Sequence, residues 1–193
     1  MRINRTGITG KARGQSTYNK LNNIDLFNVL NKNVEMALSC ILNKDLKKCE
    51  KTKKMYFAGP WFNEKSKMFY DAVSKIQHLC HDYSKYNVFF PKYQVNNKPS
   101  DAFIKNVSNI QDCDILVAFV DDKDVGTAWE IGMAYALGKN IVLLGLDDST
   151  FLSHTNAMLA FTGTCTTLME FGKLLIGKPY NIIKIEDNWE GIQ

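Results

Sequence analysis

Between residues 54 and 185, short apolar runs alternate with longer segments whose apolar residues have helical spacing. The runs are MYFAG (55–59), VFFP (88–91), DILVAFV (114–120) and NIVLLGL (140–146), with weaker extended segments near 160–165 and at 181–185. The segments between them predict helices over 64–83, 100–111, 126–137 and 166–175. Continuous apolar strands that alternate with helices are typical of a parallel sheet covered on both faces. The chain therefore predicts an α/β fold with a doubly wound parallel sheet of about five strands.

Ligands of such flavodoxin-like or Rossmann-like sheets bind beyond the carboxyl ends of the strands. The loops that follow the strands are therefore the candidate functional segments. In this sequence they cover residues 58–64, 91–98, 121–126 and 147–158.

The N-terminal part of the chain differs in charge from the rest. Residues 1–54 hold 12 of the 24 Lys and Arg residues but only 4 of the 20 Asp and Glu residues. Residues 1–23 predict an irregular basic arm, because they contain three glycines and five basic residues but no acidic residue. Their GITGKARG stretch lacks the spacing of a phosphate-binding loop. Residues 24–43 predict an amphipathic helix, and 44–54 a charged linker. The helix carries an apolar stripe that must cover either the main domain or a second subunit: Phe27, Leu30, Val34, Leu38, Ile41 and Leu42.

We therefore expect two parts, an N-terminal helical extension over 1–53 and the main domain over 54–193. The main domain is mildly acidic, which argues against nucleic acid as a partner. The sequence contains no run of 18 apolar residues and no secretory signal pattern, so we expect no membrane association. Five scattered cysteines indicate free thiols in a reducing compartment, and we expect a cytoplasmic protein.

The segment from Val125 to Leu137 carries the candidate chemistry. Glu130 is its single charged residue, and the other residues are apolar or small enough for burial on nearly every face. A buried carboxylate is costly unless it is paired or used, although Glu130 could also reach solvent from an exposed turn. Asp124 stands six residues earlier, where it could cap the helix or join the site. Two nearby carboxylates with different roles are typical of glycosyl-bond chemistry.

Three separated segments resemble the nucleoside 2-deoxyribosyltransferase family. Tyr56-Phe57-Ala58-Gly59-Pro60-Trp61-Phe62 resembles the family's first strand and its base-stacking loop. Asp124-Val125-Gly126-x-x-x-Glu130-x-Gly132 resembles its catalytic segment, and Asn156-Ala157-Met158 a loop that reaches a neighbouring subunit's site.

The resemblance implies that 2-deoxyribose is transferred from a 2′-deoxynucleoside donor to a free nucleobase acceptor. Glu130 would be the nucleophile, and Asp124 would hold the sugar hydroxyls. Asn156 and Met158 would contact the sugar of a neighbouring subunit, which implies a homo-oligomer with shared sites. A carboxylate nucleophile needs no metal, and we expect no cofactor.

The remaining candidates surround the base. Tyr56 could orient Glu130 or simply be a core tyrosine, while Trp61 and Phe62 could stack on a base. Gln94 could read a base edge or lie solvated in its loop. The resemblance also places Gly59 at the base-binding loop.

Asn106 departs from the family pattern, which usually has an aspartate there that helps to protonate the base. An amide cannot deliver a proton as a carboxylic acid can. This leaves two alternatives open: an N-glycoside hydrolase on the same scaffold, and a nucleoside-binding module without activity. The loop Gly59–Glu64 has few donors for a 5′-phosphate, which disfavours a nucleotide hydrolase.

Overall fold

The computed structural model describes residues 17–42, 46–60, 62–91, 98–148, 150–151 and 157–185. Its centre is a parallel sheet made of β1 (Lys53–Ala58), β2 (Tyr86–Phe89), β3 (Ile115–Phe119), β4 (Asn140–Gly145) and β5 (Thr164–Thr167). The strand order is β2-β1-β3-β4-β5, which is the order of flavodoxin-like sheets. The predicted fold class is therefore confirmed.

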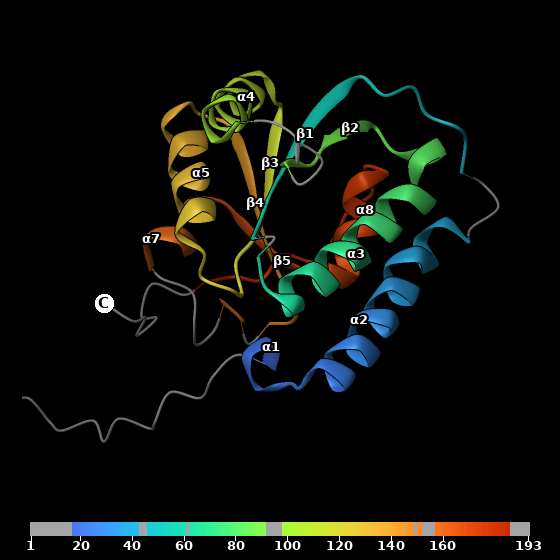
Figure 1. The fold of residues 1–193 in the computed structure, drawn as a ribbon. Coiled ribbons are helices and arrows are strands. Elements are labelled where there is room, and N and C mark those ends of the chain that lie inside the picture. Colours follow the sequence, from blue (N-terminus) through green and yellow to red (C-terminus); the bar gives the residue numbers. More distant parts are fainter. Residues whose placement is uncertain are drawn as a thin grey trace, which may run out of the picture.

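Helices cover both faces of this sheet. α2 (Asn23–Leu38), α3 (Glu64–Leu79) and α8 (Phe171–Leu175) lie on one side, and α4 (Pro99–Asp112) and α5 (Val125–Ala136) on the other (Figure 1). Short elements are α1 (Thr17–Lys20), α7 (Ala157–Ala160) and the 3-10 turns η1 (Ser39–Ile41), η2 (His81–Tyr83) and η4 (Leu168–Glu170). No helix in the described part of the chain is long and apolar enough to cross a membrane.

Strand register fixes which residues face each helical layer. Met55 pairs with Ile115, and Ala118 pairs with both Ala58 and Leu143. Side chains alternate across each strand, so the two faces have separate cores. Phe57, Val117 and Leu144 face α2, α3 and α8, whereas Tyr56, Leu116 and Leu143 face α4 and α5.

Polar caps explain where the helices next to the candidate site begin and end. The Asn63 side chain accepts a hydrogen bond from the Ser66 backbone at the start of α3, and Ser66 accepts one in return. Asp124 caps α5 by accepting a hydrogen bond from the Thr127 backbone. Gly138 follows α5 with φ of +66°, a backbone conformation that suits a glycine directly after a helix end.

The N-terminal extension differs from the prediction in two respects. Residues 17–20, assigned to an irregular arm, form α1, and the buried Tyr18 packs edge-on against Phe119 with ring centroids 5.2 Å apart. The stripe on α2 is also rotated, because Leu26 is buried while Phe27 is 55% exposed. Leu26, Leu30, Val34 and Ala37 join the same core as α3, so α2 covers the main domain.

The prediction that the segment 125–137 is buried on nearly every face is wrong. Only one face of α5 packs on the sheet, and it carries Thr127, Ile131 and Ala134. Trp129 is 47% exposed and Tyr135 61% exposed. Composition alone does not predict this exposure, because a helix that covers a sheet buries only the face that packs on the sheet, even when its other face carries apolar residues.

The C-terminal region is less regular than the sequence predicted. The expected helix over 166–175 consists of η4 and α8. The expected extended segment at 181–185 contributes a single antiparallel bridge, between Ile183 and Cys165.

Candidate active site

Tyr56 and Glu130 meet at the contact between β1 and α5. The Tyr56 hydroxyl donates a hydrogen bond to Glu130 Oε1 at 2.5 Å. The Tyr56 side chain is fully buried and stacks on Phe89, with ring centroids 5.6 Å apart. Glu130 is half-buried, so one side of its carboxylate is held by the protein while the group stays within reach of solvent.

This environment changes the acidity of both groups. Burial raises the pKa of Glu130 from 4.5 to about 7, with a further rise from the negative charge of Asp124 and a partial offset from the Tyr56 hydrogen bond. Burial and the neighbouring Glu130 raise the pKa of Tyr56, so Tyr56 remains a hydrogen-bond donor. A carboxyl group whose pKa lies near neutrality is typical of a reactive site.

Asp124 lies at the start of α5, on the Glu130 side of the sheet. Its Oδ2 accepts hydrogen bonds from the Thr127 backbone at 2.7 Å and from Thr127 Oγ1 at 2.9 Å. Among the described residues, Oδ1 accepts no hydrogen bond. Asp124 is therefore a helix cap that keeps one carboxylate oxygen available, so the two roles considered from the sequence are compatible.

Two further aspartates after β3 hold the neighbouring loops. Buried Asp121 accepts hydrogen bonds from the Leu146 backbone at 2.7 Å and from Thr150 Oγ1 at 2.6 Å. Asp122 accepts a hydrogen bond from Asn63 at 2.6 Å. The β3 loop is thus tied to the loops after β4 and β1.

These three hydrogen bonds were not predicted from the sequence. The signal for them was the cluster of three aspartates at 121, 122 and 124, directly after a buried strand. Burial is the largest of several influences on the Asp121 carboxyl group, and it raises the pKa of this group to about 7.

The structure places the other predicted residues as follows. Gly59 is buried at the end of β1 beside Phe119, and Phe62 is 81% exposed in the loop before α3. Asn106 is half-buried on α4, which packs beside α5. Trp61, Gln94 and Asn156 lie outside the described residues, as does the side chain of Met158.

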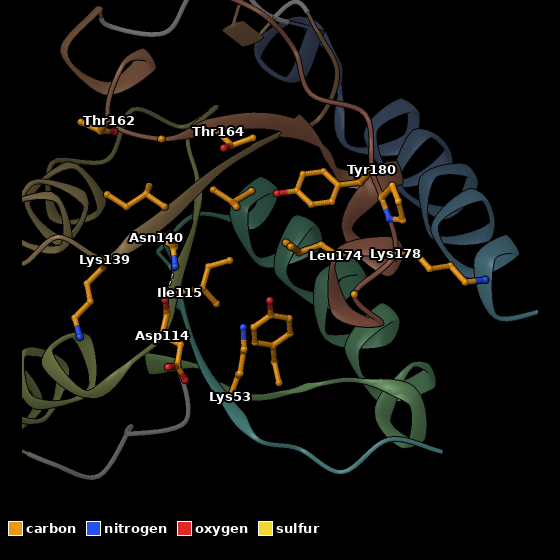
Figure 2. Close-up of a pocket in the computed structure, with 16 residues that line it drawn as sticks. Lys53, Asp114, Ile115, Lys139, Asn140, Thr162, Thr164, Leu174, Lys178 and Tyr180 are labelled. Carbon is orange, nitrogen blue, oxygen red and sulfur yellow. Dashed lines mark hydrogen bonds between the residues drawn. The ribbon is translucent and has the colours of Figure 1, made fainter. Parts of the chain in front are cut away.

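A large cavity lies at the other edge of the sheet. It has a volume of about 760 Å³ and is lined by residues that begin strands, among them Lys53, Asn140 and Thr164, together with Asp114 and Tyr180 (Figure 2). Parallel strands begin at one edge and end at the other, so this cavity is remote from Asp124 and Glu130. We assign the candidate chemistry to the carboxyl edge, because the carboxylate pair lies there.

A metal site would require several ligating side chains close together in the ranges that the structure describes. Within those ranges, no three His, Cys, Asp or Glu side chains are grouped so that they could hold a metal ion.

The fold and this arrangement define a class: a doubly wound α/β protein with a carboxylate pair at the carboxyl edge of its sheet. Residues 55–174 match the family model of the nucleoside 2-deoxyribosyltransferases. The chain belongs to this family of enzymes, which act on nucleosides and nucleobases.

Three solved structures are similar to this chain. A 2-deoxyribosyltransferase from Bacillus psychrosaccharolyticus is 27% identical, with a TM-score of 0.48 over 58% of this chain and 85% of its own. A 2-deoxyribosyltransferase from Leishmania mexicana is 25% identical, with a TM-score of 0.41 over 55% of this chain and 76% of its own. A CMP N-glycosidase from Clostridium botulinum is 20% identical, with a TM-score of 0.44 over 64% of this chain and 97% of its own. No curated protein matches the chain.

Proposed function

We propose that this protein transfers 2-deoxyribose between nucleobases through a covalent ester on Glu130. The observation that carries the proposal is the hydrogen bond from the buried Tyr56 to Glu130 Oε1. It orients one carboxylate oxygen and stabilises the charged form of a group that burial would otherwise keep protonated. Family membership supports the same chemistry.

The reaction is a double displacement. A Glu130 carboxylate oxygen attacks the anomeric carbon of the 2′-deoxynucleoside, the N-glycosidic bond breaks, and the base leaves with the bonding electrons and takes up a proton. The nitrogen of a second base then attacks the same carbon and gives up its proton, and the ester bond to Glu130 breaks, which regenerates the carboxylate. Two displacements restore the original configuration at the sugar carbon.

Asp124 is proposed to hold the sugar. Its free Oδ1 can accept a hydrogen bond from a sugar hydroxyl, while Oδ2 stays fixed by Thr127. The negative charge of Asp124 also favours the positive charge that develops on the sugar ring in the transition state. Both effects position the anomeric carbon for attack.

The polar side chains of the loop after β1 support a nucleoside rather than a nucleotide as the donor. Asn63 is engaged by α3 and by Asp122, and Glu64 accepts a hydrogen bond from Asn23 at 2.7 Å. Glu64 also adds a negative charge that would repel a phosphate. The proposed setting is nucleoside salvage in the cytoplasm, with a homo-oligomer as the working form.

One assay tests the activity. The protein is incubated with a 2′-deoxynucleoside, with and without a second free base, and products are separated by chromatography. Transfer predicts a new deoxynucleoside when the acceptor is present. Release of base at the same rate without an acceptor would instead identify a hydrolase, and no reaction in either case would identify a binding module.

The covalent intermediate needs its own measurement. Protein held with donor alone is digested, and mass spectrometry should find deoxyribose on the peptide that contains Glu130. Transfer without this adduct in a rapidly quenched sample, together with an active Glu130→Ala variant, would contradict the proposed mechanism.

A further inference from the structure

The cavity at the amino edge of the sheet is built from several parts of the chain (Figure 2). It lies where the five strands begin, and the segment that follows α8 forms one side of it. Its volume of about 760 Å³ falls within the usual range of ligand pockets, roughly 300 to 1,000 Å³. The carboxylates of the candidate active site lie at the opposite edge, so the reaction proposed above does not account for this cavity.

Positive charge dominates the rim of the cavity. Of the charged residues that line it in the described part of the chain, one is acidic and three are basic: Asp114, Lys53, Lys139 and Lys178. Lys85 adds a further amino group, because a Cβ atom at Gly177, which also lines the cavity, would lie 2.6 Å from Lys85 Nζ. The Asp114 carboxylate is engaged, since its Oδ2 accepts a hydrogen bond from the Lys54 backbone at 2.7 Å. The cavity therefore attracts an anionic ligand.

Two donors that line the cavity are available to such a ligand. The Lys53 amino group and the Tyr180 hydroxyl group have no hydrogen-bond or ion-pair partner among the described residues. Figure 2 shows both side chains directed into the cavity, Lys53 from the start of β1 and Tyr180 from the segment after α8. Lys139 differs, because its Nζ donates to the Gln111 carbonyl oxygen at 2.6 Å. Lys53 is therefore the amino group that we expect to meet the charged part of a ligand.

The rest of the lining includes apolar side chains. They belong to β3, β4 and α8 and are buried apart from the small area that faces the cavity: Ile115, Ile141, Val142 and Leu174. An inorganic anion would fill only a small part of this volume and would gain nothing from covering apolar surface. A ligand that joins an anionic group to a flat ring would use both the lysine and the apolar lining.

We propose that this cavity binds a nucleoside 5′-monophosphate, with its phosphate at Lys53 and its base against the apolar lining. A phosphate monoester carries about 1.5 to 2 negative charges at neutral pH, which suits the excess of lysine at the rim. The Tyr180 hydroxyl donates a further hydrogen bond to the ligand. The acidic carboxyl edge and the basic amino edge of the sheet then bind different molecules, a nucleoside at the first and a nucleotide at the second. Binding at the amino edge does not depend on the transfer activity, so either proposal can fail without the other.

Isothermal titration calorimetry of the whole protein tests the site, with adenosine 5′-monophosphate, adenosine and inorganic phosphate as separate probes. Adenosine 5′-monophosphate carries ribose, so it is not a donor of 2-deoxyribose. We expect it to bind at least about tenfold more tightly than either of the other probes, because it alone uses both the charged and the apolar parts of the cavity. Added salt should weaken this binding. Equally tight binding of inorganic phosphate or of adenosine, or no saturable binding of the nucleotide, would overturn the proposal.

Variants locate the bound nucleotide. Lys53→Gln should weaken its binding about 10- to 100-fold, since a charge-assisted hydrogen bond is lost, and Tyr180→Phe should weaken it about 2- to 10-fold. Lys75→Gln is the matched control, because it removes the same charge from an exposed position on α3 outside the cavity. It should leave binding unchanged, and denaturant unfolding verifies that each variant is folded.

Asp124→Asn distinguishes the two edges of the sheet. It removes a negative charge from the candidate active site, so a nucleotide bound there would bind this variant more tightly. We expect no change in nucleotide affinity. Tighter binding to Asp124→Asn, together with unchanged binding to Lys53→Gln, would place the nucleotide at the carboxyl edge and overturn the proposal.

Discussion

The Tyr56 hydroxyl and Glu130 Oε1 lie 2.5 Å apart, although 74 residues separate them in the sequence. Tyr56 comes from the central part of a buried strand, and Glu130 from the helix that follows the next strand of the sheet. Because both elements are rigid, the distance between the two oxygens is set by strand register and helix packing. The consequences for activity, acidity and stability can be measured separately.

Glu130→Gln should abolish transfer while making the folded protein more stable at neutral and alkaline pH. The pKa of Glu130 is raised by folding from 4.5 to about 7, so the folded state binds this proton more tightly than the unfolded state. The stabilisation that the Glu130 carboxyl group contributes is fully present below pH 4.5 and is lost as the pH rises through 7. At pH 8 the neutral glutamine should therefore gain about 1 to 3 kcal/mol in the free energy of unfolding.

Denaturant unfolding at pH 8 and pH 4 measures this effect, which should be near zero at the lower pH. Glu35→Gln, which changes an exposed glutamate on α2, is the matched control and should alter neither stability nor transfer. A Glu130→Gln protein that retains more than about a tenth of the transfer rate would remove Glu130 from the role of nucleophile.

Tyr56→Phe should shift the pH dependence of transfer. The nucleophile must be ionised, so the rate should rise with pH through the pKa of Glu130, near 7. Because the Tyr56 hydrogen bond lowers this pKa, its removal should move the acidic limb of the profile to higher pH. The loss of rate should then be larger at pH 6 than at pH 9. Tyr83→Phe, in η2 after the far end of α3, serves as control. Equal losses at both pH values would argue against this role of Tyr56.

Thr150→Val should destabilise the protein by about 1 to 3 kcal/mol, since it removes a hydrogen bond to a buried carboxyl group. Thr150 Oγ1 donates to Asp121 Oδ1 at 2.6 Å, and a Cβ atom at Gly145 would lie 2.7 Å from this hydroxyl. Valine preserves the branched shape that packs against Gly145, so the measurement reports the loss of the hydroxyl group. Thr150→Ser keeps the hydroxyl group and should lose less stability than Thr150→Val. Urea unfolding of both variants provides the comparison, and equal losses would assign the effect to packing.

Asn106→Asp should raise the rate of base release by about 10 to 100-fold if acid assistance is what the asparagine withholds. The gain should appear near and below neutral pH, where a partly buried aspartic acid still carries its proton. The alternative is that the amide suits another base edge, in which case base preference changes and the best rate does not. pH–rate profiles on one purine and one pyrimidine deoxynucleoside distinguish these outcomes. If neither rate nor preference changes, Asn106 is not at the base.

A mixture of inactive Glu130→Ala and inactive Asn156→Ala proteins should recover about a quarter of the wild-type activity if sites are shared between subunits. Exposed apolar side chains beside the candidate site support such a contact between copies, namely Phe103, Ile104, Trp129 and Tyr135 on α4 and α5. Subunit exchange is verified first with differently tagged copies. No recovery after verified exchange would count against shared sites.

The sequence alone determined the alternation of strands and helices and the edge of the sheet that carries the polar loops. Buried strands need continuous apolar runs, and helices need apolar residues every three to four positions, so both are readable locally. The cap at Asp124 and the helix end at Gly138 are local as well, since each satisfies backbone groups within a few residues.

Only the tertiary structure decided what these elements contact. Strand register brings Tyr56 to Glu130, and burial raises the pKa of Glu130, neither of which is encoded in any short segment. The same holds for Asp121, which two distant donors satisfy, and for Tyr18, which packs on Phe119. The periodicity of the sequence predicts whether a side chain faces an apolar or a polar environment. Interatomic distances, burial and the pKa values of side chains depend instead on which layers pack together when the chain folds.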